Sequence, residues 1–485
     1  MGRRQRLLHS AFSVLDIHSK PSSSVGATKV TVGTDAVHAS VMTGTCVVAA
    51  DDTRLPKLWA SMCAAGGAAP SRLLQAATAS PSTEAATQAA AAADACWERL
   101  HLGDWSTVAV AWRDAYTLAT LLLAQHMADI KDICRALDMA ALVGGNLFRP
   151  ELDDALTAAL RSLADDERRA KRQRVEHGDA NAGRALGHDE PLTGDDAVVL
   201  PDGAGRGGVP IDELPSMERF ATCYMSPSPG QPVLLTGLLR DWPALRLWSN
   251  AQYLMTAAGE RTVPVELGEH YLSPSWSQQL MTLREFLDAH VLGNRCNATT
   301  RRGYLAQHPL FEQVPALARD IRTPEYCSLG SSDKPATCNA WLGPAGTVTP
   351  LHTDPHHNLL CQVVGVKHVR LYAPSCTLLL YPHTQGHVKN SSRVDVRRVD
   401  DAQFPLFKEA PFIDVDLRAG QVRWHNISAP GCHLLACDAF LRPGALHPAP
   451  LVALCHVADD ILLREFLLGL RNALSASEAH NIRHS

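Results

Sequence analysis

Large apolar residues recur at three- and four-residue steps in the segment that begins near residue 96. The residues on this stripe are Trp105, Val108, Trp112, Tyr116, Ala119 and Leu123. Such spacing places side chains on one face of a helix. Similar patterns cover residues 130–142 and 151–163. We therefore predict an α-helical domain over residues 96–165, in which the aromatic side chains form the core rather than a binding groove.

Short apolar runs alternate with turn residues from about residue 209 onward. The clearest runs are residues 232–235, 262–265, 359–364 and 368–372. Gly365 and Pro374 end the last two, and runs bounded in this way are typical of β-strands. Strands at this density, with a few helices such as residues 282–291, predict an all-β sandwich or barrel with helical additions.

Three stretches lack a strong pattern of this kind. Residues 1–95 are rich in small residues and become low-complexity near 76–93, which predicts flexible chain. Residues 166–208 are polar and Gly-rich, as linkers are. Residues 446–485 form a C-terminal tail, and helical periodicity over 452–474 predicts that it is partly helical.

Composition narrows the class of protein. A chain of 485 residues has room for two or more structured units. The net charge of −5 is spread over both signs, which argues against a general nucleic-acid surface. Thirteen cysteines without a Cys-x-x-Cys pair favour reduced thiols and argue against a zinc-finger module. The chain has no apolar run of about 18 residues, so we expect no transmembrane helix.

Five basic residues lie within residues 168–174, in the predicted linker. Such a cluster is typical of a nuclear import signal, and equally of the solvated end of a helix. We expect a nuclear protein on this basis. The alternatives are the cytoplasm, or an organelle entered through the Arg- and Ser-rich, acid-poor N-terminus.

His352 and Asp354 form the candidate chemical centre, because they are two positions apart along the chain. If this stretch is a strand, both side chains leave from the same face. A histidine and a carboxylate are two of the three ligands in the 2-His-1-carboxylate site that holds non-haem Fe(II). His177 and Asp179 share the spacing in a stretch typical of a loop, so the spacing alone is weak.

Lys367 strengthens the interpretation of this centre. In the predicted strand after Gly365 it alternates onto the same side as Val369 and Leu371. A lysine on the apolar side of a barrel strand is costly unless an anion meets it. The C5 carboxylate of 2-oxoglutarate is such an anion. The alternative is an edge-strand lysine whose amine reaches water.

A third iron ligand has to come from a later strand. The candidates are His425, His433, His447 and His456. Residues 421–427 are typical of a strand, 428–431 of a turn, and 432–441 of a returning strand. We prefer His433, which opens the returning strand, over His425, which lies within the preceding one.

Several motifs together resemble the JmjC-type Fe(II)/2-oxoglutarate oxygenases. They are residues 339–358, Gly-Tyr-Leu-Ala-Gln-His at 303–308, Val366-Lys367, Asp-Trp-Pro at 241–243, Trp248-Ser249, Arg-Thr-Val-Pro-Val-Glu at 261–266, and the helical stretches 103–105 and 112–116. The resemblance implies a mainly β double-stranded β-helix, the cupin-like JmjC barrel, over residues 209–445, behind an N-terminal α-helical domain.

The resemblance also implies roles for individual residues. His352 and Asp354 match iron ligands, and Tyr304, Thr349, Asn358 and Lys367 match the positions that hold 2-oxoglutarate. Glu266, Trp276 and Trp341 match residues that line the substrate pocket. An acid between two aromatic rings suits a guanidinium or a methylated ammonium group. Without the resemblance, the two tryptophans are better explained as core.

The implied activity is hydroxylation of a protein side chain, either on arginine or, as histone lysine demethylation, on a methylated lysine. The implied partners are a protein substrate such as a histone tail, with no nucleic-acid motif and no membrane. After Gly420 the chain departs from the family pattern, through a divergent C-terminus or a mis-spliced gene model. The alternative function is therefore a catalytically impaired barrel that acts as a chromatin or protein scaffold.

Overall fold

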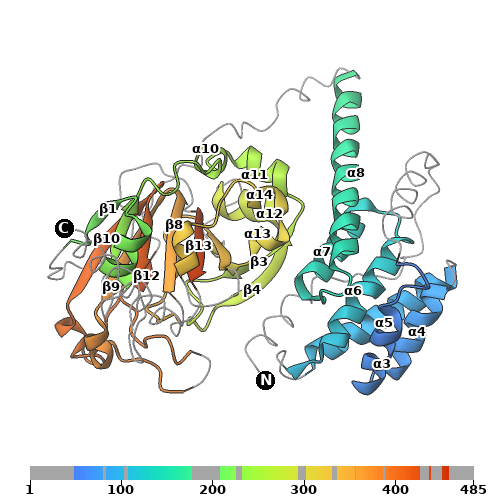
Figure 1. Cartoon of the computed structure of the whole chain (residues 1–485), viewed down its shortest axis with the longest axis horizontal. Helices are drawn as coiled ribbons and strands as arrows, with labels where there is room; N and C mark the ends of the chain where they lie inside the picture. Colours follow the sequence, from blue (N-terminus) through green and yellow to red (C-terminus); the bar gives the residue numbers. More distant parts are fainter. Residues whose placement is uncertain are drawn as a thin grey trace, which may run out of the picture. The chain divides into compact units, whose positions relative to one another are not determined.

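The computed structural model describes residues 48–79, 83–102, 107–176, 208–225, 232–292, 302–329, 336–354, 357–385, 388–425, 436–438 and 451–457. The chain divides into two compact units (Figure 1). The first contains residues Met1–Gly187 together with Gly259–Val263 and Gln278–Arg284. The second contains His188–Ala258, Pro264–Ser277 and Glu285–Ser485.

The first unit is built from helices, drawn blue to teal in Figure 1. They are α3 (Leu55–Ala64), α4 (Ala68–Ala79), α5 (Thr83–His101), α6 (Val110–Ala124), α7 (Ile130–Val143) and α8 (Arg149–Glu176). Trp112 and Ala119 of α6 lie in their shared core, and Tyr116 and Leu123 pack against it, which confirms the helical stripe from Trp112 onward. Val108 is buried in the same core but precedes α6. Trp105 lies outside the described residues. None of the described helices is long and apolar enough to cross a membrane.

The prediction of flexible chain over residues 1–95 is wrong for α3, α4 and most of α5. Alanine has the highest helix propensity, and its short side chain lets helices approach closely. In α5, Ala89, Ala92 and Cys96 are fully buried in the core of the unit. A face of small residues therefore packs without the large apolar residues that the sequence lacks here.

The predicted linker also begins too early, because α8 continues to Glu176. Arg168 pairs with Asp165 at 3.3 Å and Arg169 with Asp166 at 2.9 Å, each three residues apart along the helix. Such pairs support an exposed helix. Nuclear import through residues 168–174 stays a prediction, which imaging of the chain with these basic residues changed to glutamine would test.

The described strands form two sheets, and most of their residues belong to the second unit. The larger has the order β1-β2-β11-β8-β13-β6-β5-β3-β4 and the smaller the order β10-β9-β12-β7. The strands are β1 (Ile211–Glu213), β2 (Val233–Thr236), β3 (Thr262–Leu267), β4 (Ser277–Thr282), β5 (Gly303–His308), β6 (Thr337–Leu342), β7 (Val348–Thr349), β8 (His357–Val364), β9 (Val366–Tyr372), β10 (Phe412–Arg418), β11 (Val422–His425), β12 (Ala436–Asp438) and β13 (Leu451–Val457).

Short helices connect these strands. The α-helices are α9 (Met217–Phe220), α10 (Ala244–Leu247), α11 (Ala251–Ala258), α12 (Leu283–Phe286), α13 (Leu310–Gln313) and α14 (Pro315–Ala318). Single turns of π-helix cover Ala221–Met225 and Leu287–Val291, and 3₁₀ turns cover Glu325–Leu329, Pro374–Leu380 and Phe407–Glu409. The predicted barrel with helical additions is confirmed.

One apolar cluster joins the two sheets. Leu234 and Leu360 contribute to it from the larger sheet, and Val369, Leu371 and Leu417 from the smaller one. Because side chains alternate along a strand, this cluster identifies the inner face of each strand. The two sheets therefore face each other as a double-stranded β-helix, and its interior is the place where a small molecule could be enclosed.

The helical periodicity predicted over residues 452–474 is wrong for β13. This strand pairs with β6 on one side and β8 on the other, with Val452 opposite Trp341 and Gln362. Pairing on both sides satisfies the backbone N–H and C=O groups of the strand. A short apolar run has no period that separates a buried strand from a helix, so only these neighbours decide the outcome. Of the predicted returning strand 432–441, the described part is β12.

Opposite charges face each other on β9 and β10, on the side away from the apolar cluster. His368 lies opposite Asp416, with 2.9 Å between Nδ1 and Oδ1, and its Nε2 lies 3.4 Å from Asp414. Arg370 donates two hydrogen bonds to Asp414, at 2.7 and 2.8 Å. Burial alone would lower the pKa of His368, but the two carboxylates outweigh burial and raise this pKa to about 9.

This pair makes stability dependent on pH at alkaline values. Below the ordinary histidine pKa of about 6.5, both the folded and the unfolded chain hold the proton and the contribution of His368 is complete. It is lost as pH rises through about 9. We expect the free energy of unfolding to fall by at most about 3 kcal/mol over this window. Denaturant unfolding of wild type and His368→Gln between pH 6 and 10 checks this prediction. The same dependence of the free energy of unfolding on pH in both proteins would contradict it.

Candidate metal and co-substrate site

His352 and Asp354 lie between β7 and β8 and converge although the segment that carries them is not a strand. His352 Nδ1 lies 2.8 Å from the Pro350 carbonyl oxygen. A carbonyl only accepts, so Nδ1 carries the proton and Nε2 keeps its lone pair. His352 Nε2 lies 3.4 Å from Asp354 Oδ1. The predicted pairing on one side of the chain therefore holds, through hydrogen bonds instead of strand alternation.

Asn358 holds the other oxygen of the carboxylate. Its Nδ2 donates to Asp354 Oδ2 at 2.7 Å, and the side chain is 1% exposed. Its own Oδ1 is buried and accepts no hydrogen bond from the residues that the structure describes. Asp354 is thus oriented from both sides, and the amide of Asn358 keeps one acceptor directed into the buried space.

The ionisation of His352 reflects this setting. Burial opposes its protonation, but the charge of Asp354 and hydrogen bonds to Asp354 and the Pro350 carbonyl raise the pKa of His352 above its ordinary value. The charge of Lys367 acts in the opposite direction. Lys367 therefore lies near enough for its charge to affect the pKa of His352, although the two residues are 15 positions apart along the chain.

Lys367 lies on the inner face of β9, two residues before Val369, which belongs to the apolar cluster. The side chain is 3% exposed, so the alternative of an amine that reaches water is wrong. Within the part of the chain that the structure describes, it forms no hydrogen bond or ion pair. A buried ammonium group without a counter-charge is costly, so this position fits an anionic ligand.

Three other predicted residues lie on strands of the two sheets. Glu266 of β3 is opposite Tyr304 of β5, so the two side chains leave the same face of the sheet. Tyr304 is 8% exposed. Thr349 is half-buried at the end of β7, opposite Cys437. Glu266 and Tyr304 are therefore brought together by strand pairing, which places a predicted substrate residue beside a predicted co-substrate residue.

Gly343 sets how closely the end of β6 approaches Tyr304. A Cβ atom at this glycine would lie 2.6 Å from Tyr304 Cδ2 and 2.7 Å from Thr347 Cγ2. Real Cβ atoms essentially never approach so closely, so one of these side chains would have to move. The glycine is therefore needed for the present place of the Tyr304 ring.

Gly343→Ala should displace Tyr304 and weaken 2-oxoglutarate binding by about tenfold, with a loss of about 1–3 kcal/mol in the free energy of unfolding from overpacking. Calorimetric titration with Mn(II) and 2-oxoglutarate checks the affinity. Gly208→Ala is the matched control, because a Cβ there meets nothing within 4 Å. Unchanged affinity in Gly343→Ala would contradict the role given to Tyr304.

The two predicted substrate tryptophans occupy separate places. Trp341 is half-buried on β6 and packs against the apolar cluster. Trp276 immediately precedes β4, and its buried Nε1 donates to none of the described residues. No ring contact joins the two among the residues that the structure describes. Their role as a cage therefore stays a prediction, and Trp276 retains a hydrogen-bond donor for a ligand.

The four candidates for the third metal ligand fall into two groups. His433 and His447 lie outside the described residues. The backbone of His425 lies opposite Asn358 in the β11–β8 ladder, and that of His456 lies opposite Asn358 in the β13–β8 ladder. Two predicted candidates thus flank the residue that orients Asp354. Among the described residues, no group of three or more His, Cys, Asp and Glu side chains could hold a metal ion.

The two ligands present fit a divalent iron ion. A ligating histidine usually donates its other ring N–H to a carbonyl or carboxylate, as His352 does to Pro350. Adjacent ligand atoms about 2.1 Å from a metal lie about 3 Å apart. The distance from His352 Nε2 to Asp354 Oδ1 is 3.4 Å, so small side-chain rotations would suffice.

A segment without a recognisable motif, residues 388–397, lies against this centre. Ser392 N–H donates to the Leu351 carbonyl at 2.7 Å, and Thr353 N–H donates to the Asn390 carbonyl at 2.7 Å. Asn390 returns a hydrogen bond to the Thr353 carbonyl at 3.0 Å. Backbone hydrogen bonds of this kind do not depend on residue type or spacing, so no sequence signal could have revealed them.

Comparison with known proteins identifies both parts of the chain. Residues 218–423 match the family model of a cupin-like domain, and residues 48–174 match that of KDM8-like N-terminal ARM repeats. The match to the cupin-like domain ends at residue 423, before His425 and His433. The helical unit is therefore a repeat domain of known type.

Three relatives illustrate the range of similarity. Lysine-specific demethylase JMJ30 of Arabidopsis thaliana is 36% identical over 405 residues, which cover 78% of this chain and 90% of the relative. Lysine-specific demethylase 8 of Danio rerio is 37% identical over 342 residues, 68% of this chain and 79% of the relative. The human bifunctional peptidase and (3S)-lysyl hydroxylase JMJD7 is 30% identical over 254 residues, 44% and 75% respectively.

Proposed function

The chain belongs to the family of cupin-like JmjC oxygenases with KDM8-like N-terminal repeats, and from this membership we propose that it is an Fe(II)- and 2-oxoglutarate-dependent dioxygenase of a protein side chain. The observation that carries the proposal is Lys367. It is a buried cation in the barrel interior without a counter-charge among the described residues, close enough to His352 to affect its protonation.

The residues of the chain would bind, orient and shield. His352 and Asp354 would hold the metal, with His433 proposed as the third ligand and His425 as its alternative. The Lys367 ammonium group would donate a charge-assisted hydrogen bond to the far carboxylate of 2-oxoglutarate. When bound, iron and 2-oxoglutarate supply the oxidising power that acts on a C–H bond.

Three further residues complete the proposed co-substrate site. The free Oδ1 of Asn358, the hydroxyl of Tyr304 and the hydroxyl of Thr349 would orient the bound acid. The apolar cluster around Val369 and Leu371 would keep water from the reacting centre, which strengthens each polar contact there. The protein thus contributes position and a dry interior.

The proposed substrate is a cationic protein side chain held near Glu266, Trp276 and Trp341. An acid and aromatic rings suit both arginine and methylated lysine. On an arginine carbon the hydroxyl group stays, whereas on an N-methyl group hydroxylation leads to demethylation. Two of the relatives are named lysine-specific demethylases and one a lysyl hydroxylase, which supports a protein substrate and leaves both outcomes open.

The test is succinate release from 2-oxoglutarate in the presence of Fe(II). We expect the wild-type chain to release succinate and His352→Ala to lose this activity by about 100-fold or more, because removal of a metal ligand empties the site. His126→Ala, which changes an exposed histidine of the helical unit, is the matched control and should keep full activity. Equal turnover in wild type and His352→Ala would contradict the proposal that the chain is a dioxygenase with His352 as a metal ligand.

A second candidate function is a catalytically impaired barrel that acts as a chromatin or protein scaffold. It is favoured by the end of the cupin-like match at residue 423, ahead of the proposed third ligands. Two ligands alone would hold iron weakly. Metal content of the purified chain after incubation with Fe(II) and gel filtration separates the two functions: one equivalent supports the oxygenase, and a trace supports the scaffold.

A further inference from the structure

The segment between β3 and β4, residues 268–276, adjoins the proposed substrate pocket. It follows Glu266 closely and ends at Trp276, so two of the three proposed substrate residues lie at or beside its ends. A shift of this segment would therefore move a proposed substrate contact relative to the metal ligands. How the segment is held in place then decides how well the substrate pocket is formed.

Packing alone does not hold this segment. A cavity of about 310 Å³ lies under it, lined by His270 and Leu272 on one side and by Pro350 and Leu351, just before His352, on another. Val394 and Asp395 line it as well. Because close packing fixes most buried segments, a segment that borders open space needs other contacts to fix its position.

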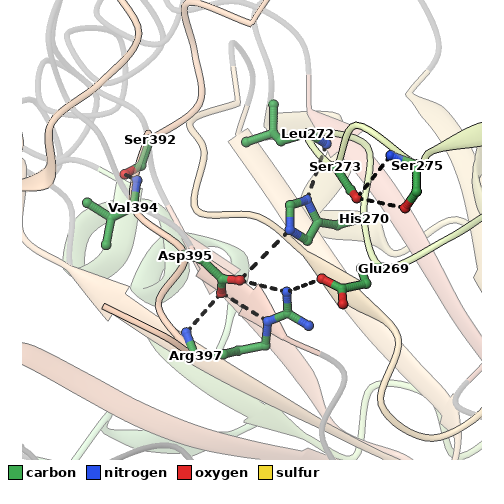
Figure 2. Close-up of polar contacts among 9 residues, drawn as sticks. All are labelled: Glu269, His270, Leu272, Ser273, Ser275, Ser392, Val394, Asp395 and Arg397. Atoms are coloured by element: carbon green, nitrogen blue, oxygen red, sulfur yellow. Dashed lines mark hydrogen bonds and ion pairs between the residues drawn. The ribbon is translucent and has the colours of Figure 1, made fainter. Parts of the chain in front are cut away.

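Polar contacts supply that restraint, and several of them lead to residues 388–397 (Figure 2). Arg397 Nη2 lies 3.5 Å from Glu269 Oε2. The Tyr271 hydroxyl lies 2.9 Å from Ser391 Oγ, and Ser391 forms a β-bridge with His352. Segment 388–397 therefore contacts the metal-ligand segment through its backbone and segment 268–276 through its side chains.

Arg397 is held in this connection by three hydrogen bonds to Asp395. Its Nε and Nη2 donate to the two oxygens of Asp395 at 2.9 and 2.7 Å, and its own backbone N–H donates to the same carboxylate at 3.0 Å. The side chain is 9% exposed. Burial acts to raise the pKa of Asp395, but these hydrogen bonds outweigh it and lower that pKa. A bidentate pair fixes the plane of the guanidinium, so its remaining edge is aimed at Glu269.

His270 adds a contact from the same segment. Its Nδ1 accepts a hydrogen bond from the Leu272 N–H at 3.2 Å, so in the neutral ring Nε2 carries the proton. Nε2 faces Asp395 Oδ2 at 3.9 Å (Figure 2). Glu269 and His270 thus both face the Asp395–Arg397 pair, and the segment is held at two successive residues.

We propose that Arg397 is a positioning residue for the protein substrate, which holds residues 268–276 at a fixed place beside the metal ligands. The proposal rests on the proposed function for the identity of the pocket that the segment borders. It concerns the substrate side only, because no contact of Arg397 with the co-substrate residues Lys367 or Asn358 is present among those that the structure describes.

The test compares Arg397→Gln and Glu269→Gln with Arg393→Gln in the full-length chain. Arg393 is exposed, lines the same cavity and contacts the rings of Tyr381 and Phe404, so it controls for loss of an arginine. Glu269→Gln removes only the charge that joins the two segments, on a side chain 51% exposed, and should fold normally.

Two measurements are made on each variant. Hydrogen–deuterium exchange reports the opening of residues 268–276, and NMR titration with Nα-acetyl-L-arginine amide and Nα-acetyl-trimethyl-L-lysine amide reports the side-chain pocket. We expect Arg397→Gln to speed exchange over 268–276 by about tenfold and to weaken the probe that wild type binds by about fivefold. Affinity for 2-oxoglutarate with Mn(II) should change by less than about twofold. Glu269→Gln should show smaller shifts of the same kind, and Arg393→Gln none.

Exchange over 268–276 that is unchanged in both Arg397→Gln and Glu269→Gln would overturn the proposal. Faster exchange throughout the second unit, with 2-oxoglutarate affinity lost as well, would also overturn it, since that is the result of a merely structural arginine. If wild type binds neither probe, the proposed substrate pocket fails, and local exchange alone then decides whether Arg397 holds the segment.

Discussion

Lys367→Met is expected to abolish most 2-oxoglutarate binding and, at the same time, to stabilise the chain without ligand. Loss of one partner of a buried charge pair costs about 2–5 kcal/mol, so we expect affinity to fall by about 30-fold to several thousand-fold. Methionine has a similar length and no charge, and it suits the apolar surroundings of Val369 and Leu371.

The opposite effect on stability has the same origin. In the absence of an anion, Lys367 is a buried cation without a counter-charge among the described residues. Replacing a buried charge by an apolar group of similar volume stabilises proteins by about 1–4 kcal/mol. A residue that weakens the fold and strengthens ligand binding is the signature of a functional site.

Denaturant unfolding and calorimetric titration with Mn(II) and 2-oxoglutarate measure the two effects. Lys389→Met is the control, because Lys389 is an exposed lysine whose loss should change neither quantity. A Lys367→Met chain that is less stable than wild type, with unchanged affinity, would show that the lysine serves the fold and would remove the main support for the proposed function.

Asp138→Ala should be the most destabilising single change in the helical unit. Asp138 on α7 is fully buried and accepts hydrogen bonds from Arg261 Nε at 3.0 Å and Nη2 at 2.8 Å, and from the Thr262 N–H at 2.6 Å. Residues Gly259–Val263 belong to the same compact unit as the helix. One carboxylate therefore satisfies three donors, and Arg261 is itself only 5% exposed.

Alanine at this position leaves a buried guanidinium and a buried backbone N–H without an acceptor. Removal of one partner of a buried pair costs about 3–5 kcal/mol, a large part of the stability of an ordinary domain. Asp132→Ala on the same helix is the matched control. Asp132 is 58% exposed and 3.5 Å from Arg135, so its loss should cost less than about 1 kcal/mol.

Chemical denaturation followed by far-ultraviolet circular dichroism measures both variants. The double variant Asp138→Leu with Arg261→Met extends the test, because an apolar pair of similar volume should recover much of the lost stability. Equal losses in Asp138→Ala and Asp132→Ala would show that the buried pair does not stabilise the unit.

Sequence alone determined the features that depend on local periodicity. The helical stripe through Trp112 and the inward position of Lys367 both follow from the number of residues per turn or per pleat, which each element imposes on its own neighbours. The helical domain and the all-β barrel with helical additions could be predicted for the same reason, whereas the family and the double-stranded β-helix followed from motifs that resemble known proteins. Where residue size broke the pattern, as in Ala-rich α5, the prediction of flexible chain was wrong because small residues pack closely in a shared core.

The tertiary structure decided what depends on contacts between distant residues. Leu451–Val457 is a strand because β6 and β8 pair with its backbone N–H and C=O groups on both sides. Tyr271 contacts Ser391, which is 120 residues away along the chain, and Arg397 contacts Glu269 over a similar sequence separation. Such polar contacts have no period and no fixed spacing, since the path of the whole chain brings them together. The candidate ligands were thus visible in the sequence, whereas the segment that holds the proposed substrate pocket beside them was not.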